Sequence, residues 1–126
     1  MSKLEKFLAK ASQDVVRKEI TVEIDGDTWR VRQLSLTEIR ACENQADKGE
    51  KFDWHRFNDA RIVKATEHDF PWNDNSLKEA YGVHTKYELP AKLFEHNLDG
   101  YSKLLDAVRR VNADQTEREA VDEAKN

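Results

Sequence analysis

The stretch EITVEIDGDTWRVRQL, residues 19–34, most narrowly limits what this chain can fold into. Two runs of β-favouring residues flank Asp25-Gly26, a preferred pair for the two-residue loop of a type I′ hairpin. In that register the apolar face carries Ile20, Val22, Trp29 and Val31. On the opposite face, Glu23 is expected to lie diagonal to Arg30. Because a two-stranded hairpin is not stable alone in water, the apolar face must pack on helices, and Trp29 is predicted to be a core residue.

Helical patterns fill most of the remaining sequence, which predicts an α+β fold. We expect a mostly α-helical single domain with one N-terminal β-hairpin and five or six helices. A chain of 126 residues is long enough to bury one core without disulfides. The predicted parts are an N-terminal amphipathic helix and link over residues 1–17, the hairpin plus helical domain over 18–112, and an acidic tail over 113–126. The tail is predicted to be frayed or disordered, because it is almost entirely polar.

The N-terminal segment has the spacing of an amphipathic helix. Residues 2–11 place Leu4, Phe7, Leu8 and Ala11 at i, i+3, i+4 and i+7, which is one helix face. A helix this short is marginal in water, so its apolar face needs cover. Three alternatives are open: the helix docks on its own domain, lies on a partner, or touches a membrane surface.

Capping signals divide the next part of the chain into helices. Ser35 and Glu38 form a capping box that opens a helix through about Ala46, and Asp53 can cap the helix that follows, over residues 54–67. The predicted apolar contacts come from Leu36, Ile39, Cys42 and Ala46 in the first helix and from Trp54, Phe57, Ile62 and Ala65 in the second.

The C-terminal half of the domain carries one ambiguous helix and one strong one. Thr85 and Glu88 form a second capping box, but Pro90 follows five positions after the cap, so this helix must start later or kink. The last helix, over about residues 97–112, is the most periodic and is predicted to be the central core helix. Its apolar stripe is Leu98, Tyr101, Leu104, Leu105, Val108 and Val111.

The connector HDFPWND, residues 68–74, brings two aromatic side chains into a polar segment. Phe70 and Trp72 either tuck back over their own core or anchor a partner, since Trp is enriched at interface hot spots. Together with Leu4, Phe7 and Leu8, they are the candidate partner-binding residues. After the connector, Asn75 or Ser76 can start a short helix that Gly82 ends as a left-handed C-cap.

The sequence has no pattern typical of an active site, so we expect a protein that is not an enzyme, with no catalytic residue, cofactor or metal. The four histidines form no H-x-x-x-H pair, and the single Cys42 offers no zinc spacing and is interpreted as a small core residue. There is no Gly-rich phosphate loop and no nucleophile motif. The alternative, a metal-dependent hydrolase built on His68-Asp69, lacks a recognisable partner His and Asp.

Charge and hydropathy argue against nucleic acid and membranes as partners of this protein. The formal net charge is −4, of which residues 113–126 contribute −3, and no basic face suited to nucleic acid stands out. The alternative is a small DNA-binding or regulatory helical module, because residues 80–94 can be read as a helix-turn-helix. Its second helix would offer Lys86 and Glu88 rather than the Arg, Asn or Gln that read base edges. No apolar run has the length of a membrane span, and we expect a soluble, unsecreted protein.

Three motifs occur in an order that resembles a known family. They are F-D-x-x-x-F-N-D-A-R-I-V-x-A-T at residues 52–66, N-S-L-K-E-A-Y-G-V at 75–83 and Y-S-K-L-L-D-A-V-R-R-V-N at 101–112. A hairpin precedes them, followed by the helix start V-x-x-L-S-x-x-E at residues 31–38. Over residues 19–112 the chain therefore resembles the tail assembly chaperones of long-tailed phages and prophages, the XkdN-like group.

The resemblance implies a non-enzymatic helper of tail morphogenesis. Such proteins bind the tape-measure protein, keep its apolar helical segments soluble and help to recruit subunits of the major tail-tube protein. The resemblance also implies the host cell cytoplasm as the location, absence from the mature virion, and in many phages a longer frameshift product of the same gene. Self-association through the Leu4, Phe7 and Leu8 face is a further expectation, with neither nucleic acid nor membrane as a partner.

Overall fold

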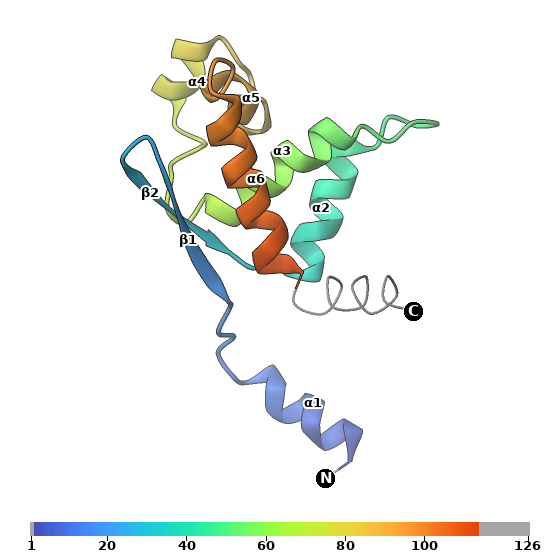
Figure 1. Cartoon of the computed structure of the whole chain (residues 1–126). Coiled ribbons are helices and arrows are strands. Elements are labelled where there is room, and N and C mark those ends of the chain that lie inside the picture. The colour runs from blue at the N-terminus through green and yellow to red at the C-terminus, as the bar shows by residue number, and fades with distance from the viewer. Residues whose placement is uncertain (1, 114–126) are drawn as a thin grey trace, which may run out of the picture.

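The computed structural model describes residues 2–113, which form two strands, six α-helices and one short 3-10 helix (Figure 1). The elements are α1 (Lys3–Ala11), β1 (Glu19–Ile24), β2 (Asp27–Arg32), α2 (Leu36–Ala46), α3 (Trp54–Thr66), α4 (Asn75–Tyr81), η1 (Lys86–Glu88), α5 (Leu89–Leu93) and α6 (Leu98–Asn112). The predicted α+β fold is confirmed. Of the predicted tail over residues 113–126, only Ala113 is among the described residues.

The hairpin has the predicted register. β1 and β2 pair antiparallel with Val22 opposite Trp29, and Asp25 and Gly26 have φ of 52° and 85°, as a type I′ turn requires. On the polar face, Glu23 lies diagonal to Arg30 as predicted, and the Arg30 guanidinium donates to the Glu19 carboxylate at 3.0 and 3.1 Å. Both Glu19 and Glu23 lie diagonal to Arg30, and Glu19 is held in place by a second contact, to His68.

The core lies where the hairpin, α3 and α6 meet, because each of these three packs on the other two (Figure 1). Two contiguous pairs, Ile62 with Val63 on α3 and Leu104 with Leu105 on α6, are buried there. Trp29 is also buried, and its ring centroid lies 5.0–6.0 Å from those of Phe70, Trp72 and Phe94. The predictions of a core Trp29 and of a central last helix are therefore confirmed.

Three residues predicted to make core contacts are instead exposed: Leu36, Trp54 and Leu98. Each is the first residue of its helix, in α2, α3 and α6 respectively. The Cα–Cβ bonds of a helix tilt toward its N-terminus, so the side chain of the first residue leans past the helix end rather than into the interface. The remaining residues predicted to make apolar contacts in these helices are buried or partly buried.

The helix ends follow their capping residues. Ser35 and Glu38 form the predicted capping box of α2, and Gly82 ends α4 with a left-handed φ of 65°. The segment around Pro90 divides into η1 and the five-residue α5, with Pro90 in the first turn of α5. A proline is tolerated there because its missing N–H would have no helical partner. Among residues 2–113, no helix combines the length and apolar character needed to cross a membrane.

Candidate partner-binding surfaces

Helix α1 extends away from the rest of the domain and buries none of its residues (Figure 1). The side chains of Leu4, Phe7 and Leu8 are 68%, 68% and 63% exposed. The Ser2 side chain accepts a hydrogen bond from the Glu5 N–H, which caps the helix. Of the three alternatives for this face, docking on its own domain is not what the structure shows, and the other two stay open.

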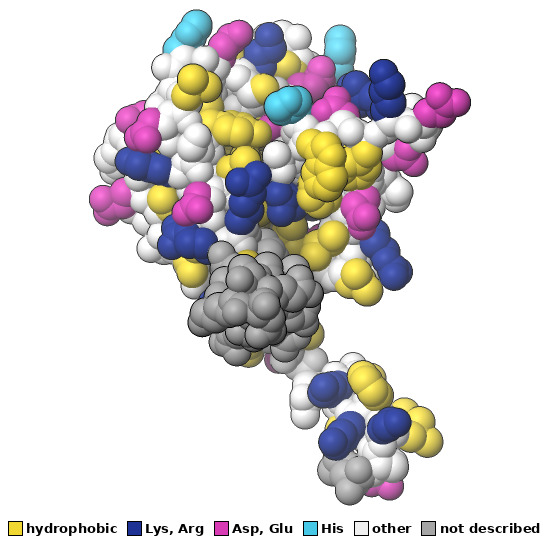
Figure 2. Space-filling model, turned by 45° about the vertical axis from the view of Figure 1, so that its right-hand side comes forward, with side chains coloured by type: hydrophobic (Ala, Val, Ile, Leu, Met, Phe, Trp, Pro, Cys, Tyr) yellow, Lys and Arg dark blue, Asp and Glu magenta, His cyan; other side chains and the backbone are white. Residues whose placement is uncertain are grey.

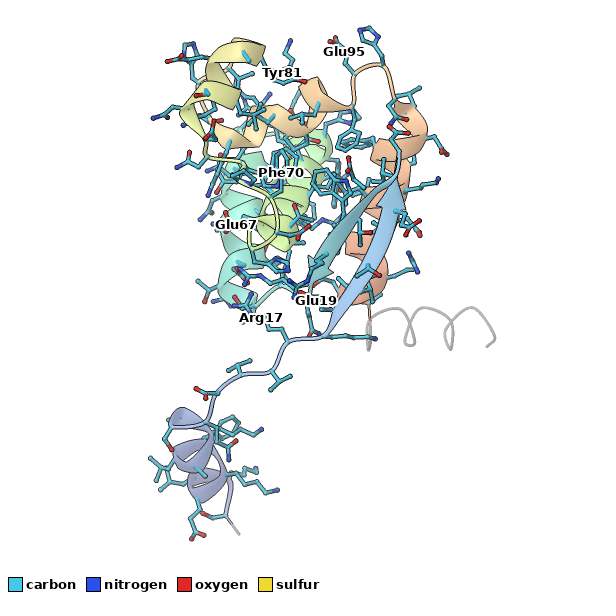
Figure 3. The ribbon with its side chains drawn as sticks, turned by 90° about the vertical axis from the view of Figure 1, so that its left-hand side faces the viewer. Arg17, Glu19, Glu67, Phe70, Tyr81 and Glu95 are labelled. Carbon is cyan, nitrogen blue, oxygen red and sulfur yellow. The ribbon has the colours of Figure 1, made fainter. Side chains whose placement is uncertain are left out.

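The link between α1 and the domain, residues 12–16, also exposes two apolar side chains. Val15 and Val16 are both highly exposed. The first firm attachment is Arg17, whose guanidinium donates to the Glu38 carboxylate at 2.6 Å in the first turn of α2. Figure 3 shows Arg17 where the link joins the domain, with α1 beyond it. The N-terminal segment therefore exposes apolar side chains both on α1 and just before this attachment.

A second apolar surface lies at the start of α3 and is here called the aromatic cluster: Phe52, Trp54 and Phe57. The three ring centroids lie 4.8–5.8 Å apart, and the Arg61 guanidinium lies 4.6 Å from the centroid of Phe57. Trp54 is 65% exposed. Trp54 was predicted to make core contacts, although the sequence does carry a signal for the contact between Phe52 and Phe57. Phe52 precedes the N-cap Asp53 and Phe57 is the fourth helical residue, which is the spacing of a hydrophobic staple.

A shallow hollow of about 420 Å³ adjoins the aromatic cluster at Phe52 and is here called the acidic hollow. It is lined by Glu43, Asn44, Asp47, Gly49, Glu50, Lys51 and Phe52. Three carboxylates against one lysine give this lining an acidic character. The turn that forms it is held by the Asp47 carboxylate, which accepts from the Gly49 N–H at 3.0 Å, and by the bridge between Asp47 and Phe52.

A second hollow, of about 490 Å³, is lined by residues of α2, α3, η1 and α5 and contains two carboxylates with altered pKa values. Burial raises the pKa of Asp59, which accepts a 2.5 Å hydrogen bond from the Tyr101 hydroxyl. The Glu88 carboxylate accepts from the N–H groups of Thr85 and His84, and these bonds lower its pKa. Both carboxylates therefore serve hydrogen bonds within the fold.

The structure brings the connector aromatics into the core rather than to a partner surface. Trp72 is 1% exposed and its indole N–H donates to the Thr66 hydroxyl at 2.8 Å, so it cannot contact a partner while the fold is intact. Phe70 is half-buried, with its ring 4.7 Å from that of Trp72 (Figure 3). Of the two alternatives for Phe70 and Trp72, tucking over their own core is the one observed. The prediction that Trp72 is a partner-binding residue is therefore wrong, because this side chain is buried in the core.

His68 and Asp69 attach this connector to the hairpin. His68 Nε2 lies 2.8 Å from a Glu19 carboxylate oxygen, and the Asp69 carboxylate accepts from the Arg30 N–H at 3.0 Å. Within residues 2–113, no group of three or more His, Cys, Asp and Glu side chains is arranged to hold a metal ion. Both residues of the pair therefore have a structural contact that accounts for their position.

The segment considered as a helix-turn-helix has a short second helix. α5 has only five residues, and Leu89 and Pro90 at its start are buried. A recognition helix needs exposed side chains along its length to reach base edges. The structure therefore leaves few α5 side chains for that task.

Comparisons with known proteins place the fold but not the function. No protein-family model matches the sequence, and no curated protein matches it. The chain is similar to a solved structure, the protein YqbN from a structural genomics project, with a TM-score of 0.65 and 17% sequence identity. The similarity covers 90% of this chain and 98% of that one. At this identity the likeness shows a shared fold, and the description of YqbN gives no function.

Proposed function

We propose that this protein is a phage or prophage tail assembly chaperone that binds the tape-measure protein and helps to recruit tail-tube subunits. The observation that carries the proposal is the apolar face of α1, where Leu4, Phe7 and Leu8 are all about two-thirds exposed. An apolar helix face is suited to pairing with the amphipathic helices of a client chain. The ordered motifs over residues 19–112 are the sequence resemblance that supports the same role.

The energetics favour a binding role for α1. Burying a Leu or Phe side chain fully contributes roughly 1.5–3 kcal/mol, so three of them together could contribute on the order of 5 kcal/mol before ordering costs. A nine-residue helix is not stable alone in water, and a client segment packed on it would stabilise the helix as well. The face therefore offers apolar area that one amphipathic segment of a client protein can cover.

Coexpression with fragments of the tape-measure protein from the same genome tests the proposal. We expect the full chain to keep an otherwise insoluble fragment in solution and to copurify with it, and the tail-tube protein to join the complex. The double variant Phe7→Asp, Leu8→Asp should lose most of the bound fragment. The matched control is Leu98→Asp, because Leu98 is an exposed apolar residue on α6 at a distance from α1.

Three outcomes would contradict the proposal. The first is a set of overlapping tape-measure fragments that all stay insoluble and unbound. The second is equal binding by the wild type, the α1 double variant and the Leu98→Asp control, because apolar contact through α1 would then play no part. The third is salt-sensitive retention of duplex DNA by the chain, which would favour the DNA-binding alternative instead.

A further inference from the structure

Two surfaces of this chain are complementary, because each has an apolar part beside a charged part and the two charges are opposite. The first is α1, where Lys3, Lys6 and Lys10 form a stripe beside the apolar face, against a single Glu5. Figure 2 shows these basic and hydrophobic side chains next to each other on α1. The Lys10 Nζ atom lies 5.3 Å from the centroid of the Phe7 ring, so the two stripes are in contact.

The second surface has the same two parts with the opposite charge. The aromatic cluster offers exposed rings at Phe52 and Trp54. The acidic hollow lies directly beside it, with the carboxylates of Glu43, Asp47 and Glu50. The apolar face of α1 can therefore pack on the aromatic cluster while the lysines of α1 lie beside the acidic hollow.

In the structure, α1 is not docked on the aromatic cluster of its own domain. Arg17 is fixed at Glu38 in the first turn of α2, whereas Phe52 and Trp54 follow the opposite end of that helix. An α-helix of 11 residues is about 16 Å long. The five residues 12–16 span roughly 18 Å when fully extended, so the link is long enough for α1 to reach that end of α2. In the structure the link and α1 run away from the domain instead (Figure 1).

We propose that α1 of one copy docks on the aromatic cluster of a second copy, with its lysines beside the acidic hollow, so that two copies exchange their N-terminal helices. Exchange of an identical element forms two equal contacts in one dimer, and this is a low-cost route to a symmetric pair. The inference concerns the chain alone, without a client, and stands whether or not the proposed function holds. If both hold, a client helix competes with the second copy for α1.

Sedimentation equilibrium of the full chain over a wide concentration range provides the first test. We expect a monomer–dimer equilibrium that weakens as salt is added, because charge pairs contribute to it. Phe7→Asp on α1 and Trp54→Asp on the cluster should each weaken dimerisation at least tenfold. The matched control Leu98→Ser removes an exposed apolar side chain from α6 and should leave the equilibrium unchanged.

Mixing the two defective variants separates exchange from other modes of association. The Phe7→Asp copy retains an intact cluster and the Trp54→Asp copy retains an intact α1, so a mixture can form one of the two contacts. We expect the mixture to dimerise more strongly than either variant alone. Two double variants test the charge complementarity in the same way. Lys6→Glu with Lys10→Glu reverses the charge of α1, and Glu43→Lys with Glu50→Lys reverses that of the acidic hollow. Each double variant should weaken the dimer, and mixing the two should restore it in part.

Tryptophan fluorescence gives an independent readout, because the other two tryptophans, Trp29 and Trp72, are buried. Quenching by acrylamide should therefore report on Trp54, and should fall as concentration rises and dimers form. A monomer at all concentrations overturns the proposal. So does a dimer that survives both Phe7→Asp and Trp54→Asp. Protection of Trp54 that depends on Phe7 but not on concentration also overturns it, because α1 would then dock within its own chain.

Discussion

The indole N–H of Trp72 donates a 2.8 Å hydrogen bond to the hydroxyl of Thr66, and both side chains are buried. The same hydroxyl donates to the carbonyl of Ile62 at 2.6 Å, so Thr66 both donates and accepts inside the core. Thr66 ends α3 and Trp72 lies six residues later, after a turn. The bond therefore fixes how the connector folds back, and it explains why an indole can be almost fully buried in a segment of polar residues.

Replacing Thr66 with Val should destabilise the protein by about 1–3 kcal/mol, because the shape is kept while the buried indole N–H loses its acceptor. Urea denaturation measures this as a lower midpoint with an unchanged slope. Thr66→Ser is the matched control, since it keeps the hydroxyl and should retain most of the hydrogen bond. A Val variant as stable as the wild type would mean that the bond to Trp72 contributes little.

Local signals predicted most of the fold. Asp25-Gly26 determines the register of the hairpin because a one-residue slip would move Trp29 to the solvent face. The capping residues Ser35 and Asp53 set the starts of α2 and α3 through bonds made within a few residues. Such information is available in sequence because donor and acceptor are neighbours in the chain.

The exposure of single side chains could not be predicted in the same way. Leu36, Trp54 and Leu98 have the correct spacing for their helical stripes, but each is the first residue of its helix. Whether a stripe is covered over its first turn depends on which element packs there, and periodicity carries no information on that. The prediction of partner surfaces is limited in the same way. Trp72 is buried because its indole bonds to Thr66, and the spacing of residues in the sequence does not predict that bond.

Gly100 provides a second test of the packing. It lies in the first turn of α6, where an added Cβ would be 2.6 Å from Asn97 Nδ2 and 2.9 Å from Ile24 Cγ2. Asn97 also caps α6 and donates to the Asp25 carboxylate at 2.7 Å, so a displaced Asn97 would disturb both helix and hairpin. We expect Gly100→Ala to destabilise the protein by roughly 1–3 kcal/mol in thermal unfolding.

The control for Gly100→Ala is Lys103→Ala, which lies one turn later on the same helix with an exposed side chain. An exposed substitution of this kind usually changes stability by less than about 0.5 kcal/mol. If Gly100→Ala were as stable as Lys103→Ala, this would contradict the close packing of α6 on Ile24 that the structure shows.

Cys42 should behave as a protected thiol. Burial raises its pKa to about 11, and the residue is 1% exposed on the inner side of α2. The thiolate is the reactive form, so modification by a disulfide reagent at pH 8 should be slow in the native protein and fast in urea. Native reactivity equal to that of the urea-unfolded chain would contradict the burial of Cys42.

Asp59 should make the protein less stable as pH rises. Burial raises its pKa above the ordinary value of 3.8, partly offset by the hydrogen bond from Tyr101. The folded state therefore holds this proton more tightly than the unfolded state does, and stability from this group is lost as pH rises from about 3.8 through the native pKa. Asp59→Asn keeps an oxygen for the Tyr101 hydroxyl and removes the charge. We expect its melting temperature at pH 7 to exceed that of the wild type.

The difference between Asp59→Asn and the wild type should shrink as the pH is lowered, because the wild-type carboxyl then becomes neutral as well. Thermal unfolding from pH 3 to 8 measures it, and subtraction of the two curves removes the other acids, such as Glu38, from the comparison. Tyr101→Phe is the complementary variant. It takes away the bond that favours the charged carboxylate, so it should lower stability most at pH 7 and least at acidic pH. A difference between Asp59→Asn and the wild type that stays constant over this range would show that the Asp59 pKa is not raised by folding.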